Sequence, residues 1–192
     1  MNQFLVALSQ QKEALRKEMR AKRSMFEKEN ANSDIALTKL FLSKMEFTKP
    51  SVIAGYNAFR YEVDVNPLMN ELREQGHIIV LPIVGEKNTL LSFHQHTKGL
   101  PLVRNKMGIL EPSMNAPALD PDVLLVPLLA FDRRHNRLGY GAGFYDRTLT
   151  ALRSKKSITA IGIAYAYQEV ENVPMGDLDA QLDKIVTSVN VF

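Results

Sequence analysis

The sequence predicts an α/β fold in which helices cover both faces of a mainly parallel, Rossmann-like central sheet, giving three α/β/α layers. Short apolar runs that are typical of buried strands alternate with segments of helical periodicity along the chain. The run VLLVPLLAF at 123–131 is continuously apolar, as strands buried on both faces are. The segment 89–96 instead alternates apolar and polar residues, which predicts antiparallel pairing at one edge of the sheet.

The first half of the chain is expected to supply the N-terminal helices and the first strands. Ser33 is a candidate N-cap for the second helix, and Asn66 followed by Pro67 is typical of a helix start. Gly76 is a stop signal for that third helix. In chain order, the expected elements are helices at 4–30 and 33–45, a strand at 51–56, a loop at 57–65, a helix at 66–75, and strands at 77–84 and 89–96.

The second half is expected to complete the sheet. The segment 100–118 contains three prolines and little periodicity, so it predicts a long loop. The elements expected after it are a strand at 123–126, a helix at 144–153, a strand at 158–164, a loop or short helical turns at 169–183, and a final strand at 184–192. Ligands bind beyond the carboxyl ends of parallel strands, so the loops after Tyr56, Pro82, Phe131 and Tyr165 are expected to form one functional rim.

Composition restricts the class of protein. The 192 residues are most simply one domain spanning 1–192, and 45% hydrophobic with 23% charged residues is ordinary for a soluble globular chain. The chain contains no cysteine, which excludes disulfides, thiolate nucleophiles and cysteine metal sites. Neither a signal peptide nor a membrane-spanning run is recognised, and we expect a cytoplasmic monomer.

A glycine-rich loop carries the most specific chemical signal. It is GYGAG at 139–143, between a charged connector and the start of a helix. Backbone N–H groups of such a loop, together with the helix N-terminus, bind phosphate. Arg137 and Arg147 flank the loop, and Asp146 could bridge to phosphate oxygens through Mg²⁺. The loop matches neither G-x-G-x-x-G nor a Walker motif, and a simple tight turn is the alternative interpretation.

Glu62 is a second candidate, because aromatic residues flank it in the loop after the first strand. Its carboxylate could bind the donor edge of a flat heterocycle, while Tyr56, Phe59 and Tyr61 could stack on the ring face. The alternative is an ion pair between Glu62 and Arg60 in solvent.

Two further sets of residues are weaker candidates for metal binding. Asp183 precedes the final strand and would be a second carboxylate near Asp146, or else a capping or surface residue. His94 and His96 share one face of a strand, but a solvent-facing edge strand explains them equally well.

Four motifs occur in order along nearly the whole chain. They are KEALR at 12–16, GY at 55–56 followed by EVD at 62–64, MGILEP at 107–112, and AFDRRHNRLGYGAGFYDRTL at 130–149, which LDKIVT follows at 182–187. Their order and spacing resemble the 5-formyltetrahydrofolate cyclo-ligases, also called 5,10-methenyltetrahydrofolate synthetases. The resemblance implies that Mg²⁺ and ATP drive the conversion of 5-formyltetrahydrofolate to 5,10-methenyltetrahydrofolate, with release of ADP and phosphate.

The resemblance also implies a set of site residues. The ATP contacts are Lys12, Arg16, Arg137, Leu138, Gly139, Tyr140, Gly141, Ala142, Gly143, Phe144 and Tyr145. The folate contacts are Asn57, Glu62, Gly141, Ala142, Gly143, Phe144 and Tyr145. The Mg²⁺ ligands are Asp146 and Asp183, and the catalytic candidates are Arg137, Arg147 and Asp146. Phosphorylation of the formyl oxygen, followed by attack of N10, requires positioning and charge neutralisation rather than a protein nucleophile.

Alternative functions follow from single features of the chain. Seven basic residues within 12–28 would suit a non-catalytic RNA-binding module, or simply a solvated helix face. A sugar-phosphate isomerase or acyl-CoA transferase would use the glycine loop. The cyclo-ligase interpretation uses both features and predicts small-molecule substrates, with neither nucleic acid nor membrane as a partner. His135 and Ala142 depart from the family pattern, which usually has glycine at the first position and glycine or lysine at the second.

Overall fold

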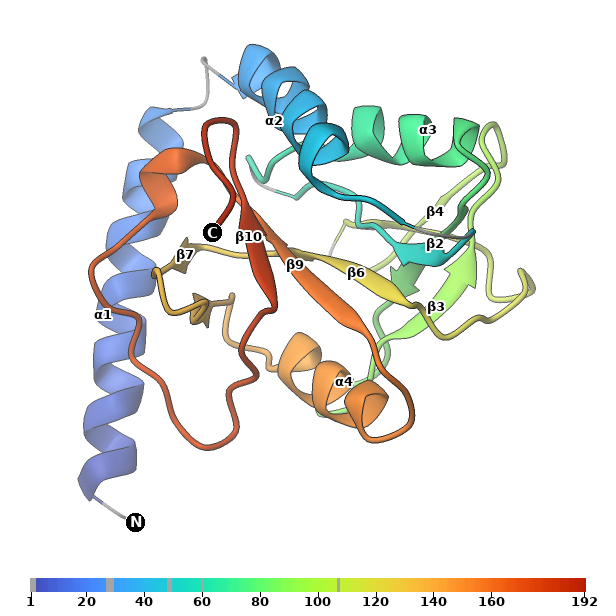
Figure 1. The fold of residues 1–192 in the computed structure, drawn as a ribbon. Helices are drawn as coiled ribbons and strands as arrows, with labels where there is room; N and C mark the ends of the chain where they lie inside the picture. Colours follow the sequence, from blue (N-terminus) through green and yellow to red (C-terminus); the bar gives the residue numbers. More distant parts are fainter. Residues whose placement is uncertain (1–2, 27–29, 48–49, 60, 107) are drawn as a thin grey trace.

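The computed structural model describes residues 3–26, 30–47, 50–59, 61–106 and 108–192, and a six-stranded sheet lies at its centre (Figure 1). The strand order is β10-β9-β6-β1-β2-β3, and all neighbours are parallel except β2 and β3. The strands are β1 (Val52–Ala54), β2 (Ile78–Ile83), β3 (Ser92–Gln95), β6 (Val123–Pro127), β9 (Thr159–Ile163) and β10 (Lys184–Val186). The predicted mainly parallel sheet with an antiparallel edge is therefore confirmed.

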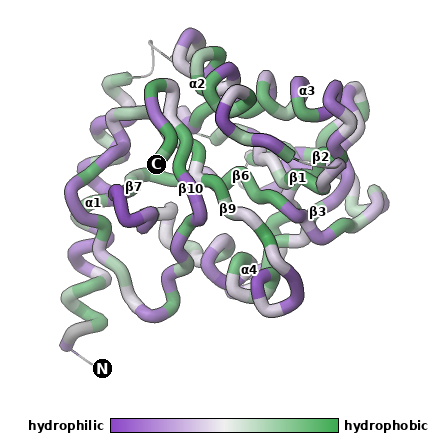
Figure 2. Tube along the Cα trace, viewed as in Figure 1, coloured by the Kyte–Doolittle hydropathy of each residue, from purple (hydrophilic) through white to green (hydrophobic). Residues whose placement is uncertain are grey.

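Helices cover both faces of this sheet, as predicted. Helices α2 (Asn30–Lys44) and α3 (Asn66–Glu74) bury Phe41 and Leu72 against one face, and α4 (Phe144–Arg153) buries Leu149 against the other. Each fully buried side chain of this size contributes about 1.5–3 kcal/mol to stability. The central strands are coloured mostly as hydrophobic in Figure 2. Their apolar runs are continuous because helices cover both faces of the sheet.

Helix α1 (Gln3–Met25) lies beside the sheet rather than on either face (Figure 1). Its Met19 is 1% exposed and belongs to a small separate core with Leu129, Leu138 and Val173. Those partners lie on or near a two-stranded ribbon formed by β7 (Ala130–Phe131) and β8 (Arg137–Leu138). This ribbon leads directly into the glycine loop, so the packing of Met19 brings α1 to that loop.

The order of the strands creates a topological switch beside β1. From β1 the chain adds β2 and β3 on one side, and later β6, β9 and β10 on the other. The connections that leave the carboxyl ends of β1 and β6 therefore run in opposite directions from one rim of the sheet. Open α/β sheets bind their ligands at such a point. The loop containing Glu62 follows β1, and the segment leading to the glycine loop follows β6.

Several expected boundaries in the first half of the chain are wrong. Helix α1 ends at Met25 rather than at residue 30, and Ser33 lies inside α2 instead of capping it, because α2 begins at Asn30. Residues 27–29 lie outside the described residues. Asn66 is the first residue of α3 and Val65 is its N-cap, while the backbone N–H of Asn66 donates to Asp64.

Three expectations for the second half also need correction. The apolar run at 123–131 is two strands, since β6 ends at Pro127, which lacks an N–H for further pairing. The loop expected at 100–118 contains a short antiparallel ribbon, β4 (Val103–Arg104) with β5 (Leu110–Glu111). The final strand stops at Val186, because the hydroxyl of Thr187 accepts hydrogen bonds from the next turn. A 3₁₀ turn, η1 (Ala166–Gln168), follows β9.

Candidate functional site

The glycine loop is shaped by two residues with positive φ. Gly141 has φ +105° and Gly143 has φ +69°, and residues with a Cβ rarely adopt such positive φ values. Gly143 is also the N-cap of α4, and within the described chain it receives no side-chain cap. Arg147 closes over the loop, because its Nη2 donates to the carbonyl of Ala142 at 2.9 Å. The result is an open helix N-terminus with a guanidinium beside it, which suits an anion.

Helix α1 contacts this loop from the side. The Nε of Arg16 donates to the carbonyl of Gly139 at 3.0 Å, and a Cβ on Gly141 would lie 3.2 Å from Cζ of Arg16. One helical turn earlier, Lys12 forms an ion pair with Asp179. The structure therefore brings Arg16 to a loop that follows it by more than 120 residues, and Lys12 to the later segment that contains Asp179.

Arg137 and Asp146 form a half-buried ion pair at the base of the loop. Arg137 is 6% exposed, and its Nη2 donates to Oδ1 of Asp146 at 2.7 Å. The same Oδ1 accepts the backbone N–H of Ala180 at 3.1 Å, while the carbonyl of Ala180 accepts from Arg137. The carboxylate also lies in the first turn of α4, where the helix dipole stabilises negative charge.

Asp183 lies in a different hydrogen-bond network from Asp146. Its Oδ2 accepts from Nη2 of Arg153 at 2.8 Å and from the backbone N–H of Ala160 at 2.7 Å. Arg153 is the last residue of α4, whereas Asp146 is in its first turn. The structure therefore does not bring the two expected Mg²⁺ ligands together. Across the described residues, no group of three or more His, Cys, Asp or Glu side chains could hold a metal ion.

Glu62 contacts the same loop through Tyr140 and is 9% exposed. Its Oε2 accepts the backbone N–H of Phe59 at 2.9 Å, and the hydroxyl of Tyr140 also donates to it. Burial raises the pKa of Glu62, while these two hydrogen bonds and the positive charge of Arg23 oppose that rise. Arg60, the partner expected in solvent, lies outside the described residues.

Two further tyrosines face Glu62. Tyr56 follows β1 and donates to the carbonyl of Val63 at 3.0 Å, while Tyr145 lies in the first turn of α4. Burial raises the pKa of both phenols, and the charge of Glu62 raises it further. Glu62 is thus a buried acid among neutral rings, and its carboxylate is bonded to Tyr140 of the glycine loop.

Asn57 and His94 each form a hydrogen bond with a backbone carbonyl. The Nδ2 of Asn57 donates to the carbonyl of Leu110 at 2.6 Å, which ties the loop after β1 to the β4–β5 ribbon. His94 is buried and its Nδ1 donates to the carbonyl of Ala116, so a solvent-facing position for it is wrong.

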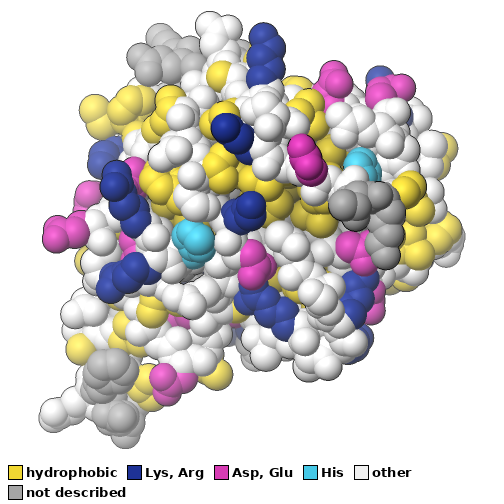
Figure 3. Space-filling model, viewed as in Figure 1, with side chains coloured by type: hydrophobic (Ala, Val, Ile, Leu, Met, Phe, Trp, Pro, Cys, Tyr) yellow, Lys and Arg dark blue, Asp and Glu magenta, His cyan; other side chains and the backbone are white. Residues whose placement is uncertain are grey.

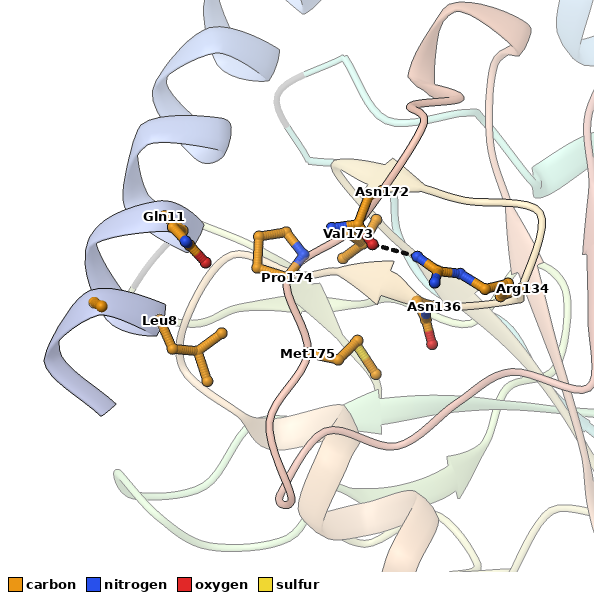
Figure 4. A pocket seen from close by; sticks show the side chains of 9 residues that line it. Leu8, Gln11, Arg134, Asn136, Asn172, Val173, Pro174 and Met175 are labelled. Carbon is orange, nitrogen blue, oxygen red and sulfur yellow. Dashed lines mark hydrogen bonds between the residues drawn. The ribbon is translucent and has the colours of Figure 1, made fainter. Parts of the chain in front are cut away.

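A cavity of about 340 Å³ opens between the first turns of α1 and the segment 172–175 (Figure 4). Apolar side chains, carboxamides and one guanidinium line it: Ala7, Leu8, Gln11, Arg134, Asn136, Asn172, Val173, Pro174 and Met175. The chain runs from this cavity to Gly176, whose N–H donates to Asp179, the partner of Lys12. The cavity is therefore adjacent to the cationic side of the glycine loop and falls within the size range of small-molecule sites.

With this geometry in place, similarity to known proteins decides the family. The model of the 5-formyltetrahydrofolate cyclo-ligase family matches residues 8–188, nearly the whole chain. The chain belongs to the 5-formyltetrahydrofolate cyclo-ligase family. A 5-formyltetrahydrofolate cyclo-ligase from Haemophilus influenzae is 34% identical over 185 residues, which cover 93% of this chain and 98% of that protein.

Solved structures extend the likeness to the fold. A 5,10-methenyltetrahydrofolate synthetase from Aquifex aeolicus matches with a TM-score of 0.78 and 30% identity, over 94% of this chain and 91% of that one. A synthetase of the same name from Mycoplasma pneumoniae matches with a TM-score of 0.74 and 27% identity, over 92% and 98%. The cyclo-ligase family makes this protein a ligase of folate metabolism that acts on small molecules, and it implies the use of ATP. No helix in the described ranges is long and apolar enough to cross a membrane.

The candidate site has neighbours that the sequence analysis missed. Arg23 is 4% exposed and donates to the hydroxyl of Tyr140 and, at 2.7 Å, to the carbonyl of Leu128. Nearby, the rings of Phe26, Tyr167 and Tyr165 form a stack with centroids 4.4 and 5.7 Å apart. One signal could have identified Arg23: Lys12, Arg16, Met19 and Arg23 recur at spacings of four, three and four, and so share one helix face.

The structure explains one departure from the cyclo-ligase pattern. His135 has φ +63° in the turn of the β7–β8 ribbon, where its N–H donates to the carbonyl of Asp132. Glycine would adopt this conformation without strain, which would account for the glycine that the family resemblance leads us to expect there. Asp132 holds the turn, because its buried carboxylate accepts the N–H groups of Arg134 and Asn136. Burial would raise the pKa of Asp132, but its hydrogen bonds outweigh burial and lower it.

Proposed function

We propose that this ligase converts 5-formyltetrahydrofolate to 5,10-methenyltetrahydrofolate and converts ATP to ADP and phosphate in doing so. One observation carries the proposal. Arginines of α1 and α4 donate to carbonyls of the five residues 139–143, and the buried Glu62 accepts a hydrogen bond from Tyr140 of the same five. A phosphate donor bound to the arginines and a flat heterocycle bound to Glu62 would thus meet at this loop. Transfer of a phosphoryl group between them requires such proximity.

The nucleotide would occupy the cationic side. We place its phosphates on the N–H groups of the loop and of the α4 N-terminus, next to Lys12, Arg16 and Arg147. The cavity lined by Leu8, Gln11 and Met175 would hold the adenosine, because apolar walls and carboxamides suit a purine (Figure 4). Arg137 would contribute positive charge from below the loop.

The donor set at Asp146 fits a magnesium ion that arrives bound to nucleotide phosphates. Such an ion keeps several waters and needs one or two carboxylates, and the described residues offer no larger cluster. Arg137 and Ala180 engage Oδ1 of Asp146, so we assign Oδ2 to the metal. Asp183 would have to leave Arg153 in order to join it. When bound, Mg²⁺ neutralises charge on the phosphate oxygens.

The folate would occupy the side of Glu62. Its carboxylate would accept hydrogen bonds from the donor edge of the pterin, and the buried ring of Tyr56 and the half-buried ring of Tyr145 would exclude water. Asn57 lies at the same rim, beyond the end of β1, where the rest of the folate would extend.

The reaction needs no nucleophile from the protein. The formyl oxygen attacks the γ-phosphorus, the bond to the β-phosphate oxygen breaks, and ADP leaves. Nitrogen N10 then attacks the activated formyl carbon, loses its proton, and phosphate departs with the former formyl oxygen. Arginines 137 and 147 and the loop N–H groups stabilise the charge that develops on the transferred group.

The packing of α1 argues for a small-molecule ligand rather than RNA. Arg16 and Arg23 donate to groups of the glycine loop, and Lys12 is paired with Asp179. On the face shown in Figure 3, the remaining Lys and Arg side chains over α1 are interspersed with acidic ones. A nucleic-acid site would need a continuous basic surface.

A mixing experiment tests the proposed function. Purified protein, Mg²⁺-ATP and 5-formyltetrahydrofolate are combined, and the near-ultraviolet absorbance of the methenyl product is followed with and without ATP. Absorbance that grows only with ATP is the expected result. A flat trace from folded protein that binds ATP would contradict the folate assignment and favour a sugar-phosphate or acyl-CoA substrate.

A further inference from the structure

We infer that Arg23 positions Tyr140 and Glu62 for folate binding, and thereby sets the strength and pH dependence of that binding. Nothing in the family motifs assigns this role to Arg23. The inference rests on the proposed function in one respect, namely that Glu62 binds the folate. It adds a residue of α1 that acts through two others rather than on the substrate.

The geometry of Arg23 suits a positioning role. Its guanidinium is almost fully buried, which is costly for a cation unless acceptors surround it. Its Nη2 is fixed on the carbonyl of Leu128, just beyond the end of β6, and its Nη1 donates to the hydroxyl of Tyr140. Its Cζ also lies 5.7 Å from the centre of the Tyr140 ring. Tyr140 is thus held by its hydroxyl and faced at its ring by a single side chain.

Tyr140 transmits this arrangement to Glu62. Because its hydroxyl accepts from Arg23, its own proton points to the carboxylate, and the structure places that hydrogen bond on Glu62. Hydrogen bonds in such chains polarise and strengthen one another. The pair therefore fixes the orientation of Glu62 and favours its ionised form, which can accept two donors from a heterocycle.

The charges around Glu62 leave this role to Arg23. The groups that face Glu62 are Tyr56 from the end of β1, Tyr140 from the glycine loop, Tyr145 from α4 and Arg23 from α1. The three tyrosines have raised pKa values and stay neutral, so Arg23 supplies the positive charge. Burial raises the pKa of Glu62, and without Arg23 nothing of opposite charge in this set would counter it.

The same face of α1 also contacts the nucleotide side. Arg16 binds the carbonyl of Gly139, and Arg23, two turns later, binds the side chain of Tyr140. Adjacent residues of the loop are thus held by one rigid helix. Arg16 would serve the phosphates and Arg23 the folate, so the two arginines should separate cleanly in binding measurements.

The test is calorimetric titration with 5-formyltetrahydrofolate and, separately, with an ATP analogue, between about pH 5.5 and 9. Arg23→Met keeps the length of the side chain and removes its charge. A raised pKa of Glu62 moves the acidic limb of folate binding upward, so we expect about tenfold weaker binding at neutral pH and a midpoint about one pH unit higher. Arg23→Lys should keep much of the wild-type midpoint, and ATP affinity should stay within about twofold in both variants.

Two further variants complete the design. Arg20→Met is the matched control, because Arg20 is more exposed on the same helix and pairs with Glu13. Tyr140→Phe removes only the hydroxyl and should raise the midpoint in the same direction, which keeps the inference testable if Arg23→Met does not fold. An unchanged midpoint in folded Arg23→Met or Tyr140→Phe, or equal losses for folate and ATP, would overturn the role of Arg23.

The proposed function fails in a distinguishable way. If wild-type protein does not bind the folate, or if Glu62→Gln binds it as tightly as wild type, the assignment of Glu62 is wrong. If Glu62→Gln loses binding while Arg23→Met retains both affinity and midpoint, only the inference about Arg23 is wrong.

Discussion

The two sides of the glycine loop differ in how they are built. On the side proposed for the nucleotide, arginines of α1 and α4 donate to backbone carbonyls of the loop. On the folate side, a carboxylate is buried among tyrosines and depends on a chain of side-chain hydrogen bonds. An anion such as triphosphate is recognised by backbone and charge, whereas a flat heterocycle needs a dry, shaped pocket. The contrast predicts that mutations on one side will weaken ATP binding, whereas mutations on the other will weaken folate binding.

The largest effect is expected from Asp146→Asn, which keeps the shape and one acceptor while removing the charge that pairs with Arg137. We expect ATP-dependent turnover to fall by about a hundredfold or more, because the metal and the arginine both lose their partner. Steady-state kinetics at several Mg²⁺ concentrations measure this, and circular dichroism checks the fold. The matched control is Asp183→Asn, at the other end of α4, which should lose less than about tenfold. Equal losses in the two variants would place both carboxylates in the metal site.

Glu62→Gln should separate the two sides of the loop. We expect folate binding to weaken by about tenfold or more, because the carboxylate becomes a single acceptor, while ATP binding changes little. The variant also changes the pH dependence of stability. Burial raises the pKa of Glu62 in the folded protein, so the wild-type protein loses stability as pH rises through that raised pKa. Glutamine does not ionise, so the variant should lose less stability toward alkaline pH. Separate titrations with each ligand and urea denaturation at two pH values measure these effects. Equal weakening for both ligands would argue that Glu62 is only structural.

Gly143→Ala should disturb the nucleotide side. A Cβ would lie 2.6 Å from Nη1 of Arg147, at a φ that alanine rarely adopts. We expect a loss of about 1–2 kcal/mol in the free energy of unfolding and a raised KM for ATP. Gly139→Ala is the control, since nothing lies within 4 Å of its Cβ. The account of the loop is wrong if both variants bind ATP as wild type does.

The smallest effect is expected far from both ligands, at His135→Gly. The change relieves the strain of φ +63° but gives the unfolded chain more freedom, so we expect a net gain of at most about 1 kcal/mol. Thermal denaturation would show a rise of a few degrees or less, with unchanged turnover. A clear loss of turnover would show that this turn takes part in the site.

How much could be predicted from sequence also differs between the two sides. The glycine loop was predictable because positive φ and close approach are local requirements that glycine meets without strain. The network of Arg23, Tyr140 and Glu62 was not, because it depends on how α1 docks against the β7–β8 ribbon. The ribbon itself was hidden, since its two-residue strands are too short for periodicity to show.

Fold class was easier to predict than boundaries. Continuous apolar runs locate buried parallel strands, yet the break after Pro127 and the turn at Thr187 depend on particular hydrogen bonds. Asp183 shows the same limit: its place before β10 was foreseen, but its partner Arg153 was not. The sequence does not tell whether Asp183 lies near the first turn of α4, which contains Asp146, or near its last residue, Arg153.

The most direct test of the account is a crystal structure with Mg²⁺, a non-hydrolysable ATP analogue and 5-formyltetrahydrofolate. We predict phosphate oxygens on the N–H groups of residues 141–145 and the pterin donor edge on Glu62, with the formyl oxygen between them. Nucleotide in the cavity beside α1 with the folate bound away from Glu62, or both ligands on one side of the loop, would contradict the claim that this loop joins the two sites.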